Sequence, residues 1–134
     1  MKPESHKVGT DIVEVSRIRQ LANEHGERFY RHVYTQAEVK WCQDRAVPEM
    51  HLAGRFAAKE AVKKALLASG EENIPLSGIE IIRQEGCPPE VSLHLDLIRP
   101  YHCQVSISHT DFLATAVAIV APQREFFQHR KRER

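Results

Sequence analysis

Residues 52–68, LAGRFAAKEAVKKALLA, constrain the fold of this chain more than any other stretch. Eleven of these seventeen residues are apolar, five are charged and one is glycine. At about 100° per residue the apolar positions surround the axis, and a helix that is apolar on every side is a buried helix. Its charged side chains must therefore pair, bind a ligand or reach the surface, because burying an unpaired charge costs several kcal/mol.

The composition is that of an ordinary globular domain, with no sign of a nucleic-acid-binding or membrane protein. Of 134 residues, 42% are hydrophobic and 28% are charged, and the formal net charge is +1. Positive charge is concentrated in residues 124–134, where five Arg and Lys accompany two Glu. We expect one domain over residues 1–121 and a charged tail over 122–134, with neither a nucleic acid nor a membrane as partner.

The cysteines favour a cytoplasmic location. Three are present, an odd number without CxxC spacing, which is typical of reduced thiols rather than of a disulfide framework or a zinc site. The N-terminal MKPESHK does not resemble a signal peptide.

The first half of the chain predicts a strand followed by helices. Residues 7–15 alternate β-branched and other residues and predict a strand, although Asp11 is of a type that strand interiors disfavour. A helical pattern follows, with Ser16 as its expected N-cap and Gly26 as its end.

Two more helices are predicted before the middle of the chain. Residues 28–33 are mixed and show no clear period. Thr35 and Glu38 then form a capping-box pattern, which should start a short helix through Cys42. The long helix is expected from about residue 49 to residue 69.

The second half changes to strand periodicity. Residues 77–83 and 90–95 alternate around a Gly/Pro turn and predict a hairpin, and residues 103–108 predict another strand. Residues 112–120 are almost wholly apolar, so we expect a central strand covered on both faces. The fold class is therefore α+β, mainly an antiparallel sheet packed on a long central helix.

Asp11 and Glu60 are the carboxylates that most need an explanation, since both have apolar neighbours. Two carboxylates brought together in a core strongly raise one pKa unless a cation lies between them. Mg²⁺ suits one or two carboxylates completed by phosphate oxygens and water. The simpler alternative, which the residue types alone favour, is that each pairs with Lys or Arg or faces solvent.

Cations on the long helix offer a second site. Arg55, Lys59 and Lys63 fall within an arc of roughly 80°, beside a strip that carries Glu60 and Lys64 four residues apart. Such a stripe can bind phosphates, because Arg binds them bidentately and Lys binds them as a point charge. The alternative is a solvated face with one Glu–Lys pair within the helix.

A third group of polar residues, Ser106-Ile107-Ser108-His109-Thr110, ends a predicted strand. No GxSxG nucleophile motif accompanies it, so a hydrolase is disfavoured. The cluster can instead donate hydrogen bonds to a phosphate or a ribose, or its hydroxyls can stabilise the turn.

These motifs together resemble one family. Residues 8–15, 35–38, 53–61 with Lys64, and 106–110 occur in the order and spacing of the holo-acyl carrier protein synthases. These are the short 4′-phosphopantetheinyl transferases, and the resemblance extends from about residue 7 to residue 121. The GRFAAKEA run followed by SISHT is the most specific part of it.

The resemblance implies a Mg²⁺-dependent transfer of 4′-phosphopantetheine from coenzyme A to a serine of apo-acyl carrier protein, releasing 3′,5′-ADP. Asp11 and Glu60 match the metal ligands, with Mn²⁺ as a possible substitute. Lys64 matches a catalytic position near the diphosphate, and the base is left open between Glu60, Lys64 and a metal-bound water. The positions matched to coenzyme A binding are Arg55, Lys59, Lys64, Ser108, His109 and Thr110.

The family also implies partners. Arg17 and Arg28 match positions that dock the acidic carrier protein, with Arg19 as a further candidate. The family further implies a homotrimer with active sites between subunits. Two departures are Cys87, where the family usually has Lys, and His32, where it commonly has Arg.

Two other functions are compatible with parts of the sequence. One is a non-catalytic carrier-protein or nucleotide-binding domain of the same fold, which gives no physical reason to keep two costly carboxylates at Asp11 and Glu60. The other is a nucleic-acid binder, and it rests only on the basic residues near 130–132.

Overall fold

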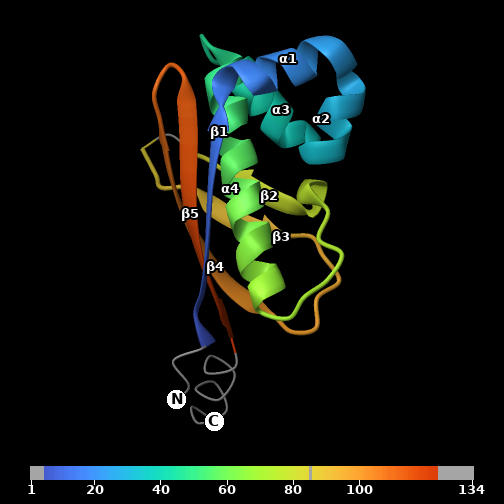
Figure 1. The fold of residues 1–134 in the computed structure, drawn as a ribbon, viewed down its shortest axis with the longest axis vertical. Coiled ribbons are helices and arrows are strands. Elements are labelled where there is room, and N and C mark those ends of the chain that lie inside the picture. Colours follow the sequence, from blue (N-terminus) through green and yellow to red (C-terminus); the bar gives the residue numbers. More distant parts are fainter. Residues whose placement is uncertain (1–4, 85, 124–134) are drawn as a thin grey trace.

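One long helix organises the computed structural model, which describes residues 5–84 and 86–123 (Figure 1). The helices are α1 (Val15–His25), α2 (Glu27–Val33), α3 (Gln36–Gln43) and α4 (Pro48–Ala68), with a short 3₁₀ helix η2 (Leu76–Gly78). The strands are β1 (Lys7–Glu14), β2 (Ile79–Ile82), β3 (Glu90–Leu93), β4 (Tyr101–His109) and β5 (Leu113–Pro122). No helix among the described residues is long and apolar enough to cross a membrane.

The strands form two antiparallel sheets. The larger has the order β1–β5–β4, and the smaller is the β2–β3 hairpin. Asp11 and Ile107 lie opposite Ala116 on either side of β5. The larger sheet packs along α4, while α1 to α3 gather around the N-terminal part of that helix (Figure 1). The α+β class expected from the sequence is confirmed.

Close packing between β1 and α4 depends on Gly9. A Cβ atom built on Gly9 would lie 1.9 Å from the carbonyl oxygen of Ala61 and 3.0 Å from the amide nitrogen of Ala65. The strand therefore rests directly on the helix backbone, and only glycine leaves room for this approach. The contact places β1 and its Asp11 beside the middle of α4.

The starts of the first helix and of strand β2 differ from the sequence prediction. The first helix begins at Val15 and not after Ser16, and its N-cap residue, Glu14, makes no side-chain capping bond. Val15 is 1% exposed, so its burial in the core sets the start of the helix. The predicted strand over 77–83 begins as η2 and is extended only over 79–82. The capping box of Thr35 and Glu38 is confirmed.

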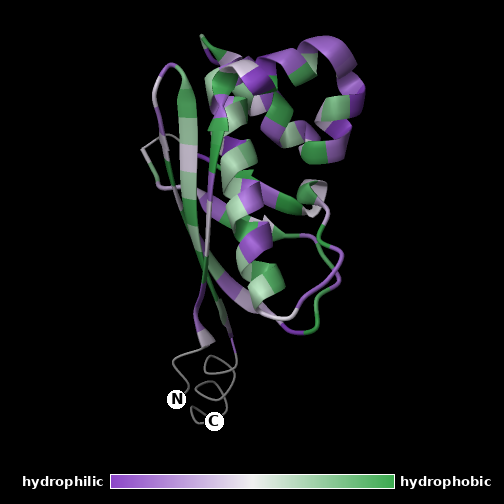
Figure 2. Ribbon diagram, viewed as in Figure 1, coloured by the Kyte–Doolittle hydropathy of each residue, from purple (hydrophilic) through white to green (hydrophobic). Residues whose placement is uncertain are grey.

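Strand β5 is central, as predicted, but it is covered on one face only. Ala114, Ala116, Ala118 and Val120 are buried, and α4 packs on this sheet. The alternate residues face outward, and Val117 and Ile119 are 43% and 42% exposed. Most of the strand is green in Figure 2, so its apolar character continues onto the uncovered face. The expectation of two covered faces is wrong for the single chain.

Candidate active site

The structure brings the two carboxylates singled out from the sequence, Asp11 and Glu60, to one pocket. Both line one open pocket of about 410 Å³ between β1, the start of α1 and α4. The Asp11 side chain is 17% exposed, so it lies at the pocket wall and not in the dry core. The other lining residues are Ile12, Val13, Glu14, Arg17 and Phe56. We call this the carboxylate pocket.

Lys64 is paired with Asp11 and not with Glu60. Its Nζ atom lies 3.2 Å from Asp11 Oδ1 and donates a hydrogen bond of 2.9 Å to the carbonyl of Thr10. The Lys64 side chain is about half exposed, so this contact is an accessible ion pair at the edge of the pocket. Lys64 therefore lies where a negatively charged ligand of the pocket would meet it.

A second constellation surrounds Trp41. The guanidinium carbon of Arg45 lies 3.5 Å from the indole centroid, and that of Arg55 lies 4.3 Å from it. The ring of His51 meets Trp41 edge-on at 5.4 Å, and His109, at the end of β4, lies 5.8 Å from His51. We call Arg45, His51, Arg55 and His109 the cationic cluster.

The cationic cluster has unused capacity to bind an anion. Within residues 5–84 and 86–123, neither Arg45 nor Arg55 forms an ion pair with a carboxylate. Arg55 is 3% exposed, yet its Nε atom has no hydrogen-bond partner, and the buried Nε of Arg83 has none either. A buried hydrogen-bond donor without a partner costs free energy. A bound anion whose oxygens accept hydrogen bonds from Arg55 and Arg83 would remove this cost.

The pKa values of Arg55 and His51 are lowered by burial and by neighbouring positive charges. Burial lowers the pKa of Arg55, and the positive charges of Arg83 and Arg45 lower it further, against Cys42 and Glu38, which raise it. Burial also lowers the pKa of His51, with further lowering by His109 and the neighbouring arginines. A bound phosphate would offset this repulsion.

The polar end of β4 divides into separate roles. His109 belongs to the cationic cluster. The Thr110 hydroxyl accepts hydrogen bonds of 3.1 Å from the amides of Phe112 and Leu113, so it stabilises the turn, which was the alternative left open. Ser108 is exposed and lies opposite Thr115 of β5.

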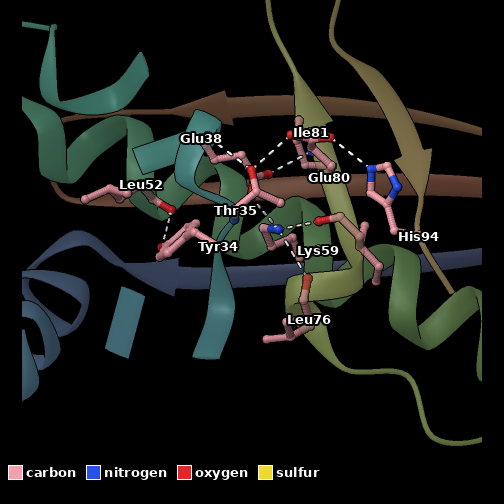
Figure 3. A network of polar contacts seen from close by, with 10 residues as sticks. Tyr34, Thr35, Glu38, Leu52, Lys59, Leu76, Glu80, Ile81 and His94 are labelled. Carbon is pink, nitrogen blue, oxygen red and sulfur yellow. Dashed lines mark hydrogen bonds and ion pairs between the residues drawn. The ribbon is translucent and has the colours of Figure 1, made fainter. Parts of the chain in front are cut away.

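Lys59 is not a ligand-facing cation, which corrects the expectation for this residue. Its ammonium lies 2.7 Å from Glu38 Oε1, and the two side chains are 0% and 1% exposed. It also donates to the carbonyls of Leu76, at 3.2 Å, and Ile79 (Figure 3). Burial lowers the pKa of Lys59 while the adjoining Glu38 carboxylate raises it.

Several residues of these sites were not singled out from the sequence for a site. Trp41, Arg45 and His51 carry no motif, because a Trp or Arg at a helix end is common on any surface. Glu38 was recognised only as a capping residue, and its pairing with Lys59 joins positions twenty-one apart. A contact of this kind leaves no periodic signal in one sequence.

One of the predicted docking residues lies at the carboxylate pocket, and the others are exposed. Arg17 lines it, and Arg28 is exposed on α2. Arg19 is exposed on α1 as well. An acidic partner approaching α1 would therefore reach the pocket mouth past Arg17.

The carboxylate pocket fits a hard divalent cation on donor chemistry. Asp11 and Glu60 supply two oxygen donors to one open space. No group of three or more His, Cys, Asp or Glu able to hold a metal occurs among the described residues. The protein thus offers a partial shell that leaves positions for water and phosphate oxygens, which is the usual arrangement for Mg²⁺.

A family model for the 4′-phosphopantetheinyl transferase superfamily (ACPS) matches residues 7–120. The chain belongs to this family. The holo-[acyl-carrier-protein] synthase of Chlorobaculum parvum is 40% identical over 116 residues, which cover 87% of this chain and 98% of the relative. That of Protochlamydia amoebophila is 39% identical over 115 residues, which cover 84% of this chain and 94% of the relative.

Solved structures of the family share the fold. An ACPS–CoA complex from Chronobacterium ammoniagenes superimposes with a TM-score of 0.77 at 27% identity, covering 89% of this chain and 98% of that one. The Helicobacter pylori synthase in complex with coenzyme A gives a TM-score of 0.69 at 26% identity, with coverage of 85% and 99%. Residues 7–120, which match the family model, include those of the carboxylate pocket and of the cationic cluster.

Proposed function

We propose that this protein is a holo-[acyl-carrier-protein] synthase, which transfers the 4′-phosphopantetheine group of coenzyme A to a serine of an apo-acyl carrier protein. The serine oxygen forms a new bond to phosphorus, and the bond from phosphorus to the 3′,5′-ADP oxygen breaks. The serine proton passes to a base. The observation that carries the proposal is the meeting of Asp11 and Glu60 in one open pocket of a chain belonging to this family.

Asp11 and Glu60 are the residues that would hold Mg²⁺, with Mn²⁺ as a substitute. When bound, the ion would neutralise negative charge on the coenzyme A diphosphate and on the oxygen of the departing 3′,5′-ADP. Lys64, already at the edge of the pocket, adds a positive charge for the diphosphate once the ligand competes with Asp11. The base that takes the serine proton stays open between Glu60, a neutral Lys64 and a metal-bound water.

The cationic cluster is the proposed binding site for the nucleotide end of coenzyme A. Phosphate oxygens there would accept hydrogen bonds from Arg55, whose Nε is buried without a partner, and from Arg45. The rings of His51 and His109, which contact each other, belong to the same cluster. Lys59 has no part in this binding, because Glu38 and two carbonyls use all three of its N–H donors.

We further propose a homotrimer in which each active site lies between two subunits. The residues that line the carboxylate pocket include none of the cationic cluster, so a coenzyme A that uses both is best supported by contributions from two chains. The outer face of the β1–β5–β4 sheet supports this assembly, because it exposes four apolar side chains, of which Ile12 lines the pocket. They are Val8, Ile12, Val117 and Ile119.

The carrier protein is proposed to dock on α1 and α2 through Arg17 and Arg28, which bring its serine to the pocket mouth. The three free cysteines agree with a reducing compartment, and the cytoplasmic location stays a prediction.

Transfer is tested by incubating the protein with coenzyme A, Mg²⁺ and several apo-acyl carrier proteins. We expect each accepted carrier to gain one phosphopantetheine, detected by mass spectrometry of the intact protein, and chelation of the metal to stop the gain. Coenzyme A binding without any gain on a panel of carriers would contradict the activity. That result would favour the non-catalytic domain.

Assembly is tested by placing a charge on the outer face of the sheet. Val117→Glu is expected to convert the trimer into monomers and to lower activity, because burying an unpaired carboxylate in a subunit interface is costly. Light scattering of the eluted protein measures the mass. The matched control is Leu67→Glu, at a residue 44% exposed on α4, which should remain trimeric. A monomeric wild-type protein with full activity would contradict the proposal.

A further inference from the structure

A buried polar network holds α4 against α3 and the β2–β3 hairpin (Figure 3). Glu38 of α3 accepts hydrogen bonds from the amides of Thr35, at 2.8 Å, and Ile81, at 2.7 Å. Lys59 of α4 completes the network through its ion pair with Glu38. One carboxylate therefore connects three elements.

Every hydrogen-bonding group of the Lys59 ammonium and both oxygens of the Glu38 carboxylate have partners. The Lys59 ammonium has three N–H groups, and they are matched by Glu38 and by the carbonyls of Leu76 and Ile79. Both oxygens of Glu38 are used as well. A fully satisfied pair in a dry core has one arrangement, because each alternative leaves a buried charge without a partner.

The next two residues of α4 link this network to the carboxylate pocket. Glu60, which follows Lys59, lines the pocket, and Ala61 carries the carbonyl against which Gly9 of β1 packs. Gly9 is two residues before Asp11. The stretch Lys59-Glu60-Ala61 is thus held on one side by Glu38 and on the other by β1. Glu60 lies between these two contacts.

We propose that Glu38 and Lys59 are positioning residues, which set the rotation and the height of α4 so that Glu60 shares one metal ion with Asp11. The contacts of Gly9 with Ala61 and Ala65 fix how close β1 and α4 approach and which side of the helix faces the strand. The buried ion pair adds a second restraint on the rotation from the side of α3 and β2, because Lys59 must reach Glu38 and the carbonyls of Leu76 and Ile79 together. This inference rests on the proposed metal site.

The test is the double variant Glu38→Gln/Lys59→Met, which removes both charges while keeping similar side-chain volumes. Binding of Mn²⁺ in the presence of coenzyme A is followed by electron paramagnetic resonance, and the Mg²⁺ dependence of transfer is measured in parallel. We expect the dissociation constant for Mn²⁺ to rise about 10-fold, as is usual when a residue supporting a metal ligand is lost. The milder variant Glu38→Asp should fold more readily and give an intermediate rise.

The matched control removes a different set of buried hydrogen bonds, which lies beyond the C-terminal end of α4. Glu71, past the end of α4, accepts hydrogen bonds from the Tyr101 hydroxyl, at 2.8 Å, and from the amide of Ile98. The control variant Glu71→Gln/Tyr101→Phe should lower the melting temperature and leave Mn²⁺ binding unchanged. An equal loss of Mn²⁺ affinity in the control, or affinity within twofold of wild type in folded Glu38→Gln/Lys59→Met, would overturn the inference. A wild-type protein that binds no Mn²⁺ with coenzyme A would overturn the metal site itself, and this inference with it.

Discussion

Glu60→Gln is expected to lower kcat for phosphopantetheinyl transfer by about a thousandfold or more while the protein stays folded. Glutamine keeps the size of the side chain but removes the charge that would hold the cation next to Asp11. Charge stabilisation by a metal ion contributes several kcal/mol, and each tenfold in rate corresponds to about 1.4 kcal/mol. Initial rates at saturating coenzyme A and carrier protein measure the effect.

Two further variants test whether the effect of Glu60→Gln comes from loss of the metal site. Asp11→Asn should give a loss of similar size, because it removes the other carboxylate of the pocket. Lys63→Gln, three residues after Glu60 on the same helix, should retain nearly the wild-type rate. Retention of more than about a tenth of the wild-type kcat by Glu60→Gln would show that the carboxylate is not a metal ligand.

Lys59→Met alone is expected to destabilise the fold by about 3–5 kcal/mol, since it leaves the Glu38 carboxylate buried without its cation. A domain of this size has a total stability of about 5–15 kcal/mol, so the variant should be partly unfolded at moderate urea concentrations. Equilibrium unfolding in urea, followed by far-UV circular dichroism, gives the difference. The Glu38→Gln/Lys59→Met variant should recover part of this loss, because no lone charge remains.

An exposed ion pair provides the comparison for Lys59. Lys40 lies 3.6 Å from Asp44, and their side chains are 80% and 60% exposed. Lys40→Met should therefore leave the urea midpoint almost unchanged, as exposed pairs contribute little. If Lys59→Met moved the midpoint no more than Lys40→Met does, the buried pair would have no role in stability.

Local patterns in the sequence were sufficient for the main elements. The all-round apolar character of residues 52–68 predicted α4 within one residue at each end, and the spacing of Thr35 and Glu38 predicted the start of α3. Both signals act between residues that are close in the chain. The short helix α2 was missed, since seven residues of mixed polarity give too few turns for a period to show.

The error at Lys59 arose from a contact that a helical wheel does not contain. Its angle on the wheel lies near that of Arg55, and both were assigned to one phosphate-binding stripe. The position of α3 decides between them, because it brings Glu38 to Lys59 and Trp41 to Arg55. The two cations are therefore both buried, yet one is fully paired and the other keeps a donor without a partner.

The uncovered face of β5 shows a second limit of prediction from the sequence. A continuous apolar run predicts that both faces of a strand are covered, and it does not say which molecule covers them. α4 covers one face, whereas Val117 and Ile119 stay exposed on the other. In the proposed trimer, a second subunit would cover this face.

The contact between Gly9 and Ala61 also restricts how this sequence can vary. The flanking residues Val8 and Thr10 point outward and are exposed, so many side chains fit there as far as the single chain is concerned. At position 9 even the smallest added side chain would meet the helix backbone at 1.9 Å. Backbone atoms cannot change rotamer to make space. Random libraries built on this protein should therefore recover glycine at position 9 whenever they are selected for the folded single chain, whereas its two neighbours vary more freely.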